Sequence, residues 1–190
     1  MRLCFCLILL LLSASTAIAA KPQITVMFDQ PEAYTDFTVA NGGREDGRPL
    51  LMAELDRYLR ERGRLWLHDD QFLTITFTDI DMAGRLVPLP LRNNVGGVKL
   101  GIAGSAREQR VVQPPWPPRL TFHYQLVDEN GQLLREGSAS INETSFLKLA
   151  PRTQYHQRDS LWYEKAILDS WLRSLNPEHA NSALTLEQDR

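Results

Sequence analysis

The chain has 190 residues, with 21 Lys and Arg against 23 Asp and Glu, and its formal net charge is −2. This balance argues against a nucleic-acid-binding protein, because such proteins concentrate an excess of basic residues on one surface. The length suits one domain with its own hydrophobic core and is too short for two domains of ordinary size.

The first 19 residues have the features of a secretory signal peptide. Arg2 precedes an apolar run over residues 3–12, and Ala17-Ile18-Ala19 fits the small-x-small cleavage pattern. The run is too short to span a membrane, which takes about 20 apolar residues. We therefore expect residues 1–19 to be removed, the rest to be periplasmic or secreted, and no membrane span to remain.

Both cysteines, Cys4 and Cys6, lie inside that apolar run. After cleavage the domain would have no disulfide, no thiol nucleophile and no cysteine-ligated metal site. Its stability would then come from the hydrophobic core alone, without the cross-links common in small exported domains.

The first half of the domain predicts a strand, a helix and a second strand. Residues 24–28 form a short apolar run that ends in turn-forming residues, typical of a strand. Pro49 suits the first turn of a helix. The apolar residues that follow it have helical spacing: Leu51, Leu55, Tyr58 and Leu59. Gly63 is typical of a helix C-cap. Residues 72–80 alternate apolar residues with threonine, which predicts a half-buried strand.

The second half predicts a hairpin and a final helix. The segment 85–118 is rich in Gly, Pro and Arg and reads as a loop, with a possible short strand at 109–113. Strands over 119–127 and 133–141 flank Asn130-Gly131, a favourable hairpin turn. A helix over 160–175 buries a stripe formed by Leu161, Leu168, Trp171, Leu172 and Leu175.

These elements predict one α+β domain over residues 20–176, followed by a disordered tail at 177–190. Hairpins give antiparallel pairing, and two amphipathic helices must bury their apolar stripes. We expect two layers: a mainly antiparallel sheet of four to five strands, with both helices on one face.

The chain resembles a family of exported Gram-negative proteins known as domain of unknown function 3016. The resemblance rests on the motif at 72–84, on Pro118-Arg119-Leu120 with Tyr124, on the Asn130-Gly131 hairpin, and on Tyr163-Glu164-Lys165 followed by Leu168-Asp169 and Trp171. Val26-Met27-Phe28 with Pro31-Glu32 also fits. The segment 93–105 departs from the pattern as a glycine-rich insertion. The resemblance implies an exported location and a shared fold, and it implies no activity.

Asp79 and Asp81 are the candidate catalytic residues. By period two they continue the apolar face of the strand at 72–80, and two carboxylates on one face can share a hard cation or divide acid and base roles. The alternative is that they cap turn amides near Ala83-Gly84 as the strand ends. The sequence favours that second interpretation, because the spacing supplies no third acid.

Glu164 falls on the apolar stripe of the final helix, so it is expected to be buried with a partner. Arg119 is the predicted partner, in a structural ion pair. Replacing Glu164 by Gln would then cost on the order of 3 kcal/mol.

Trp116, which lies among four prolines, is a candidate for a binding surface, together with His123 and Tyr124. The four histidines are scattered and do not have zinc-site spacing, so no metal site is predicted. No phosphate loop or nucleophile elbow is present, and no cofactor is predicted.

Two functional hypotheses follow. The sequence favours a non-enzymatic envelope domain that binds a protein, a peptide or a cell-wall component. The alternative is a metal-dependent or acid/base hydrolase built on Asp79 and Asp81.

Overall fold

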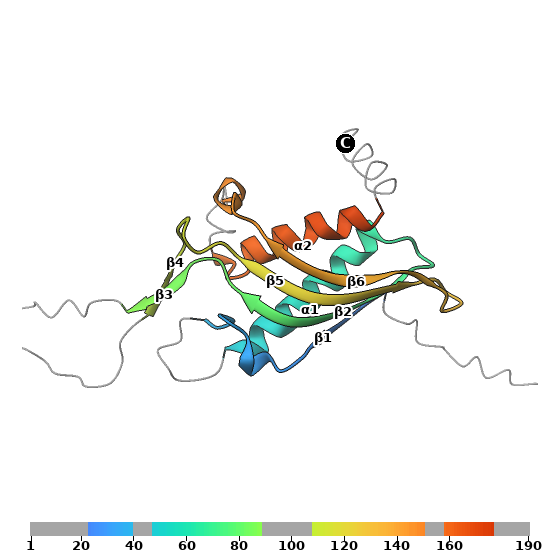
Figure 1. Cartoon of the computed structure of the whole chain (residues 1–190), viewed down its shortest axis with the longest axis horizontal. Helices are drawn as coiled ribbons and strands as arrows, with labels where there is room; N and C mark the ends of the chain where they lie inside the picture. Colours follow the sequence, from blue (N-terminus) through green and yellow to red (C-terminus); the bar gives the residue numbers. More distant parts are fainter. Residues whose placement is uncertain (1–22, 40–46, 89–107, 151–157, 177–190) are drawn as a thin grey trace, which may run out of the picture.

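The computed structural model describes residues 23–39, 47–88, 108–150 and 158–176 (Figure 1). The expected signal peptide, the insertion at 93–105 and the tail at 177–190 lie outside these residues. The described helices and strands form an α+β fold, as the sequence predicted. No helix among the described residues is long and apolar enough to cross a membrane.

The main sheet has four strands in the order β1-β2-β5-β6. Their bounds are Ile24–Phe28 for β1, Phe72–Asp81 for β2, Arg119–Val127 for β5 and Leu133–Asn142 for β6. The predicted hairpin joins β5 and β6, which pair antiparallel. β1 pairs with β2 in parallel, so the sheet is mixed, because the helix between them returns the chain to the end where β1 began.

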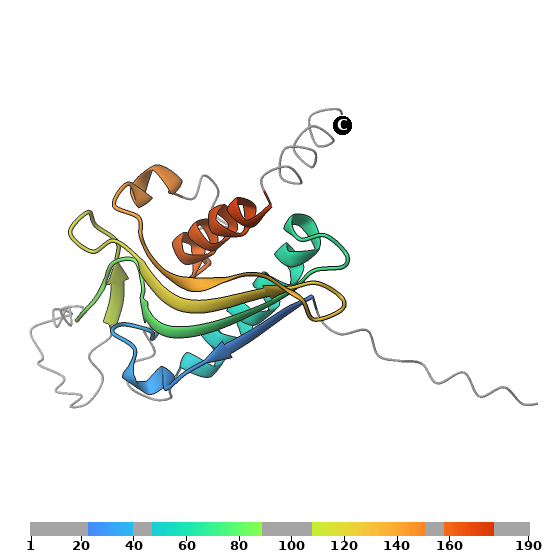
Figure 2. The same ribbon diagram turned by 45° about the vertical axis from the view of Figure 1, so that its right-hand side comes forward.

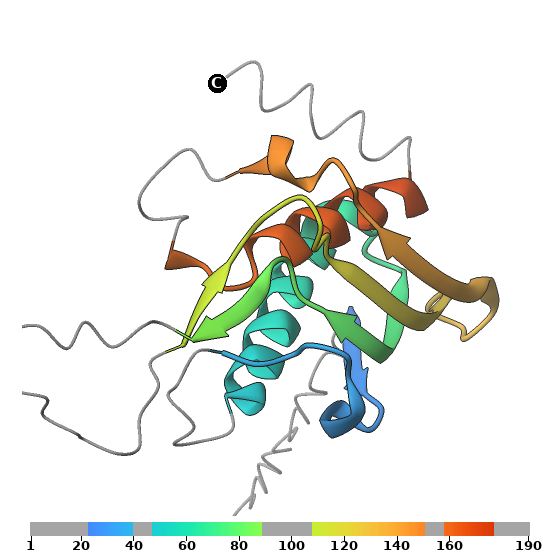
Figure 3. The ribbon, with the colours of Figure 1, turned by 60° about the vertical axis from the view of Figure 1, so that its left-hand side comes forward.

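Helices α1 (Arg48–Trp66) and α2 (Trp162–Leu175) cover the same face of this sheet (Figures 1 and 3). Ile24 packs under α1, and Phe122 meets Trp171 of α2 edge to face at 4.7 Å. These contacts belong to one core that both helices and the four strands share. The two-layer arrangement therefore follows from burying both helical stripes against one sheet.

Gly63 is not the C-cap of α1, as the sequence suggested, but lies inside the helix. A Cβ at this position would come within 2.7 Å of two Ile24 side-chain carbons. The glycine thus allows α1 to approach β1 closely. The helix continues to Trp66, which is buried, and the Leu67 N–H then donates to the Gly63 carbonyl at 2.9 Å.

A β-bulge near the end of β2 changes which face its last residues occupy. The pairing with β5 shifts between Phe77 and Asp79, and beyond the shift Ile80 pairs with Leu120 in the core. Asp79 and Asp81 pair with Thr121 and Arg119, so they lie on the face away from the helices. The expectation that both aspartates continue the apolar face is therefore wrong.

Beyond β2 and β5 the chain forms a two-stranded antiparallel ribbon of β3 (Arg85–Pro88) and β4 (Glu108–Val111), which turns away from the main sheet (Figure 2). Gly84 makes the turn with a φ of +83°, and a Cβ there would lie 2.5 Å from the Val111 carbonyl oxygen. The sequence predicted a loop over 85–118 with a possible short strand at 109–113; β4 overlaps that strand, and β3 was not expected. Instead the glycine bends the chain and pairing resumes after it.

Candidate functional site

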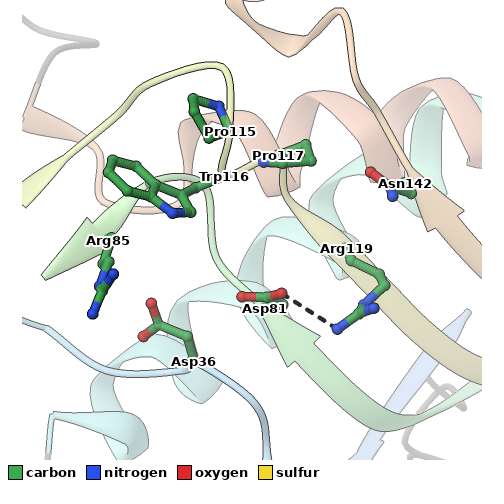
Figure 4. Close-up of a pocket in the computed structure, with 9 residues that line it drawn as sticks. Asp36, Asp81, Arg85, Pro115, Trp116, Pro117, Arg119 and Asn142 are labelled. Carbon is green, nitrogen blue, oxygen red and sulfur yellow. Dashed lines mark hydrogen bonds and ion pairs between the residues drawn. The ribbon is translucent and has the colours of Figure 1, made fainter.

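A cavity of about 410 Å³ lies where the ribbon joins the main sheet (Figure 4). We call this region the ribbon base. Its lining residues come from four stretches that are distant in sequence: Asp36, Asp81, Gly84, Arg85, Pro115, Trp116, Pro117, Arg119 and Asn142. Strand ends therefore converge here, because β2, β3, β5 and β6 all start or stop at this edge of the sheet.

The turn at residues 82–84 is held by its backbone amides, each of which has a different partner. Met82 N–H donates to the Asp36 carbonyl at 2.9 Å, and Gly84 N–H donates to the Trp116 carbonyl at 2.9 Å. Ala83 N–H donates to Glu164 Oε1 of α2 at 2.7 Å. The turn thus ties the ribbon to three separate segments of the domain.

Trp116 is held in place by its backbone. Its N–H donates to the Gln113 carbonyl at 3.1 Å, its carbonyl accepts from Gly84, and flanking prolines restrict the chain. The indole is only partly buried and forms one wall of the cavity (Figure 4). A partly exposed aromatic ring on a restrained backbone presents a large apolar binding surface.

Two acid–arginine pairs at the ribbon base differ in the number and length of their contacts. Asp36 holds Arg110 through two bonds of 2.9 Å, and Arg110 also donates to the Thr38 carbonyl at 2.9 Å. Asp81 meets Arg119 through one contact of 3.4 Å, with side chains 30% and 44% exposed. The first pair is closed, whereas the second leaves donors and acceptors free to face the cavity.

Partial burial raises the pKa of Asp81 above its usual range. The nearby Arg119 guanidinium opposes this rise, and the carboxylates of Asp36 and Asp79 add to it. The protonation of Asp81 therefore depends on the position of the Arg119 guanidinium.

Asp79 does not belong to this cavity. Its two carboxylate oxygens accept from the Thr35 N–H at 2.7 Å and from the Thr35 hydroxyl at 2.9 Å. Asp79 therefore fixes the segment after the short helix η1 (Pro31–Ala33), and not the turn at Ala83-Gly84 that the sequence suggested. In the described part of the chain, no three His, Cys, Asp or Glu side chains group as metal ligands.

Glu164 is buried, with 1% of its surface exposed, as its place on the helical stripe predicted. Its partner is the Ala83 N–H, so the predicted pair with Arg119 is wrong. Arg119 precedes the core residue Leu120 and thus lies on the opposite face of the sheet, where it pairs with Asp81. Burial raises the pKa of Glu164 to about 7, although Arg110 and the backbone bond partly oppose this.

His123 and Tyr124 lie on opposite faces of β5 and away from the ribbon base. His123 Nδ1 is 2.8 Å from the Ser138 hydroxyl on the open face. The Tyr124 ring contacts Trp171 of α2 at 5.2 Å. Both residues line a hollow of about 630 Å³ whose lining does not include Trp116, so the structure does not bring them together with it.

A second polar cluster, the helix clasp, joins α1 to α2. Asp169 accepts from Arg62, from the Trp66 indole N–H at 2.7 Å and from Arg173 at 2.8 Å. Lys165 pairs with Glu54 and Asp159, and the members of the clasp are Glu54, Arg62, Trp66, Asp159, Lys165, Asp169 and Arg173. Each buried charge here has at least two partners, which is the arrangement of a structural network.

Sequence reasoning found Asp81, Trp116 and Arg119 but missed Asp36, Arg85 and Asn142. Asn142 lies opposite Arg119 only because the β5–β6 pairing shifts register between Leu126 and Val127, since the hairpin turn alone would place Ile141 there. Asp36 and Arg85 carry no local signal, since they come to the cavity through the parallel pairing at Asp36 and the bend at Gly84.

Comparison with known proteins places the chain in a family. A model described as a protein of unknown function (DUF3016) matches residues 22–174. The chain belongs to this family. The matched residues of this chain include those of both the ribbon base and the helix clasp. The resemblance that the sequence motifs suggested is confirmed.

Among curated proteins, none has a matching sequence. Among solved structures, the chain is similar to a minor lipoprotein from Acinetobacter baumannii whose crystal structure was determined at 2.35 Å. The identity is 12%, the match covers 85% of this chain and 94% of that one, and the TM-score is 0.23. A likeness at this score carries no argument about fold or function.

Proposed function

We propose that the protein is an exported, non-enzymatic binding domain of the cell envelope, and that the ribbon base is its binding site. The observation that carries the proposal is a partly exposed Trp116 on a restrained backbone, beside a half-open Asp81–Arg119 pair in a cavity of about 410 Å³. Cavities of roughly 300–1,000 Å³ that combine an apolar wall with a few polar groups are typical ligand sites.

Export is supported by the signal-peptide pattern at residues 1–19 and by the absence of cysteine after Cys6. We expect the secreted form to begin at Ala20 or Lys21. N-terminal sequencing of the protein recovered from a periplasmic fraction checks this, and a retained Met1 in the membrane fraction contradicts it.

The alternative function, hydrolysis by Asp79 and Asp81, keeps one supporting observation. Burial raises the pKa of Asp81, which lines the cavity and is thus suited to act as a general acid. Asp79 is engaged by Thr35 and gives no second acid–base group. We therefore rank binding above hydrolysis.

The experiment uses residues 20–190 and a lysozyme digest of peptidoglycan as the probe, with binding measured by equilibrium dialysis. Trp116→Ala should abolish retention of the digest, while His123→Ala on the open face should leave it unchanged. Loss in His123→Ala alone would move the site to the open face. Binding by neither the wild type nor the variants would overturn the proposal. Conversion of the digest that stops in Asp81→Asn would establish the hydrolase instead.

A further inference from the structure

We propose that the ribbon base binds a small carboxylate ligand, which draws Arg119 away from Asp81 and lays its apolar or ring-shaped part against Trp116. The inference rests on the proposed function, because it names the class of ligand that the same cavity takes. The chemistry that recognises the ligand is a carboxylate next to a flat group. An acidic amino sugar and the free C-terminus of a short peptide both carry it.

The cavity offers positive charge that is not fully matched. Arg85 is exposed at the cavity, and no ion pair joins it to another described residue. Arg119 contributes a second guanidinium that is 44% exposed and held by a single contact of 3.4 Å. Guanidinium groups bind carboxylates through two parallel bonds, and neither arginine makes such a pair with a described residue.

Arg110 shows the contrast within the same region. It makes the two-bond pair with Asp36, and it donates to two backbone carbonyls besides. Its side chain is only 14% exposed. The charge of Asp36 is thus already neutralised by Arg110, which leaves Arg85 and Arg119 to outweigh Asp81 at the mouth of the cavity.

The remaining wall of the cavity combines an apolar surface with a polar side chain. Trp116 and the prolines on either side of it form an apolar surface, and Asn142 lies across the cavity beside Arg119 (Figure 4). An amide can donate to and accept from a ligand at once. Together these groups suit a ligand that has one apolar face, hydrogen-bonding groups at its edge and one negative charge.

A carboxylate bound to Arg119 would also change the protonation of Asp81. The charged groups that face Asp81 are Asp79 on β2, Asp36 beside β2, Arg110 on β4 and Arg119 on β5, with Arg85 of β3 at the same cavity. Arg119 is the main group that lowers the pKa of Asp81, so its capture by a ligand raises that pKa further. The complex then takes up a proton, and affinity rises as the pH falls through the window between the free and bound pKa values.

The test is isothermal titration calorimetry on residues 20–190 with two matched pairs of probes. N-acetylmuramic acid is compared with N-acetylglucosamine, which lacks the carboxylate. Acetyl-Phe-Ala is compared with its C-terminal amide. We expect the acid of at least one pair to bind at least about tenfold more tightly than its neutral partner, and the pair that responds identifies the source of the carboxylate.

Variants then locate the effect. Arg119→Gln and Arg85→Gln should each weaken binding of the acid by about tenfold, whereas Arg57→Gln, in an exposed pair with Glu61 on α1, should not change it. Wild-type affinity should increase as the pH is lowered from 7.5, and Asp81→Asn should remove that dependence. Unchanged melting temperatures exclude unfolding as the cause.

Equal affinity for the acid and its neutral partner, or full affinity in Arg119→Gln, would overturn the carboxylate inference and leave the proposed function standing. If none of the four probes binds while the peptidoglycan digest still binds, the carboxylate inference is also overturned and the proposed function stands. Failure of the probes and of the digest overturns both.

Discussion

The helix clasp and the ribbon base both contain acidic and basic side chains, but the pairs are enclosed in the clasp and partly open at the ribbon base. In the clasp, Asp169 and Lys165 are nearly buried, and each has at least two charged partners. At the ribbon base, Asp81 and Arg119 share one long contact and remain half open. Charges enclosed by their partners stabilise the fold, whereas charges left partly unmatched beside a cavity are available to a ligand.

Removing the centre of the clasp should have the largest effect on stability. Asp169→Ala leaves two guanidinium groups and the Trp66 indole N–H without their acceptor, and it should lower the free energy of unfolding by about 4 kcal/mol. Urea denaturation measures the loss. Asp56→Ala, which breaks an exposed i,i+4 pair with Arg60, is the control and should cost about 0.5 kcal/mol.

Glu164 should make the fold less stable as the pH rises. Its pKa goes from 4.5 in the unfolded chain to about 7 in the fold, so the folded state holds the proton more tightly. The resulting stability is complete below pH 4.5 and is lost as the pH rises to 7, a change of about 3 kcal/mol.

Glu164→Gln mimics the protonated side chain and can still accept from the Ala83 N–H. The variant should therefore match the wild type near pH 4.5 and exceed its stability by about 3 kcal/mol at pH 8. The sequence led us to expect that Glu164→Gln would destabilise the fold by breaking a pair with Arg119. The structure does not contain that pair, so the expected effect is now a gain in stability at high pH. Urea melts across pH check the difference, with Glu61→Gln as an exposed control. A constant difference between pH 4.5 and pH 8 would contradict the account.

Gly84 should be the glycine that the ribbon base depends on most. Gly84→Ala combines a φ of +83° with a Cβ placed 2.5 Å from the Val111 carbonyl oxygen, and it should cost about 2 kcal/mol. Gly131→Ala is the matched control, since its φ is +81° but no atom lies within 4 Å of the added Cβ. The control should cost about 1 kcal/mol. Equal losses in thermal or urea unfolding would mean that the close contact at Gly84 is relieved without cost.

The smallest effect is expected at Asp79. Asp79→Ala removes two hydrogen bonds from Thr35 and should lower stability by about 1 kcal/mol while leaving ligand binding unchanged. Comparison of dialysis and urea data for Asp79→Ala and Asp81→Asn checks this. Loss of function in Asp79→Ala with unchanged stability would favour the hydrolase alternative.

Much of the fold could be predicted from local patterns. The alternation of apolar residues and threonine found β2, the Asn130-Gly131 turn found the β5–β6 hairpin, and helical spacing found the buried stripe with Glu164 on it. These features depend on short-range periodicity, which a sequence shows directly. The burial of Glu164 was predicted for the same reason.

What the sequence could not show depends on long-range geometry. The bulge after Phe77 places Asp79 and Asp81 on the face away from the helices. The alternation of threonine with apolar residues does not predict this bulge. The partner of Glu164 is a backbone N–H, which every residue except proline carries, so no side-chain pattern identifies it. Asp36 and Arg85 reach the cavity only through the sheet topology and the bend at Gly84.

The central claim, that the ribbon base and not the open sheet face is the binding site, is tested most directly by NMR. Uniformly ¹⁵N-labelled residues 20–190 are titrated with the peptidoglycan digest, and amide and indole N–H shifts are mapped. The account predicts that the largest shifts fall on the Trp116 indole and on the amides of Gly84 and Arg119. Shifts centred on His123 and Gln125 of the open face, or no shifts at all, would contradict it.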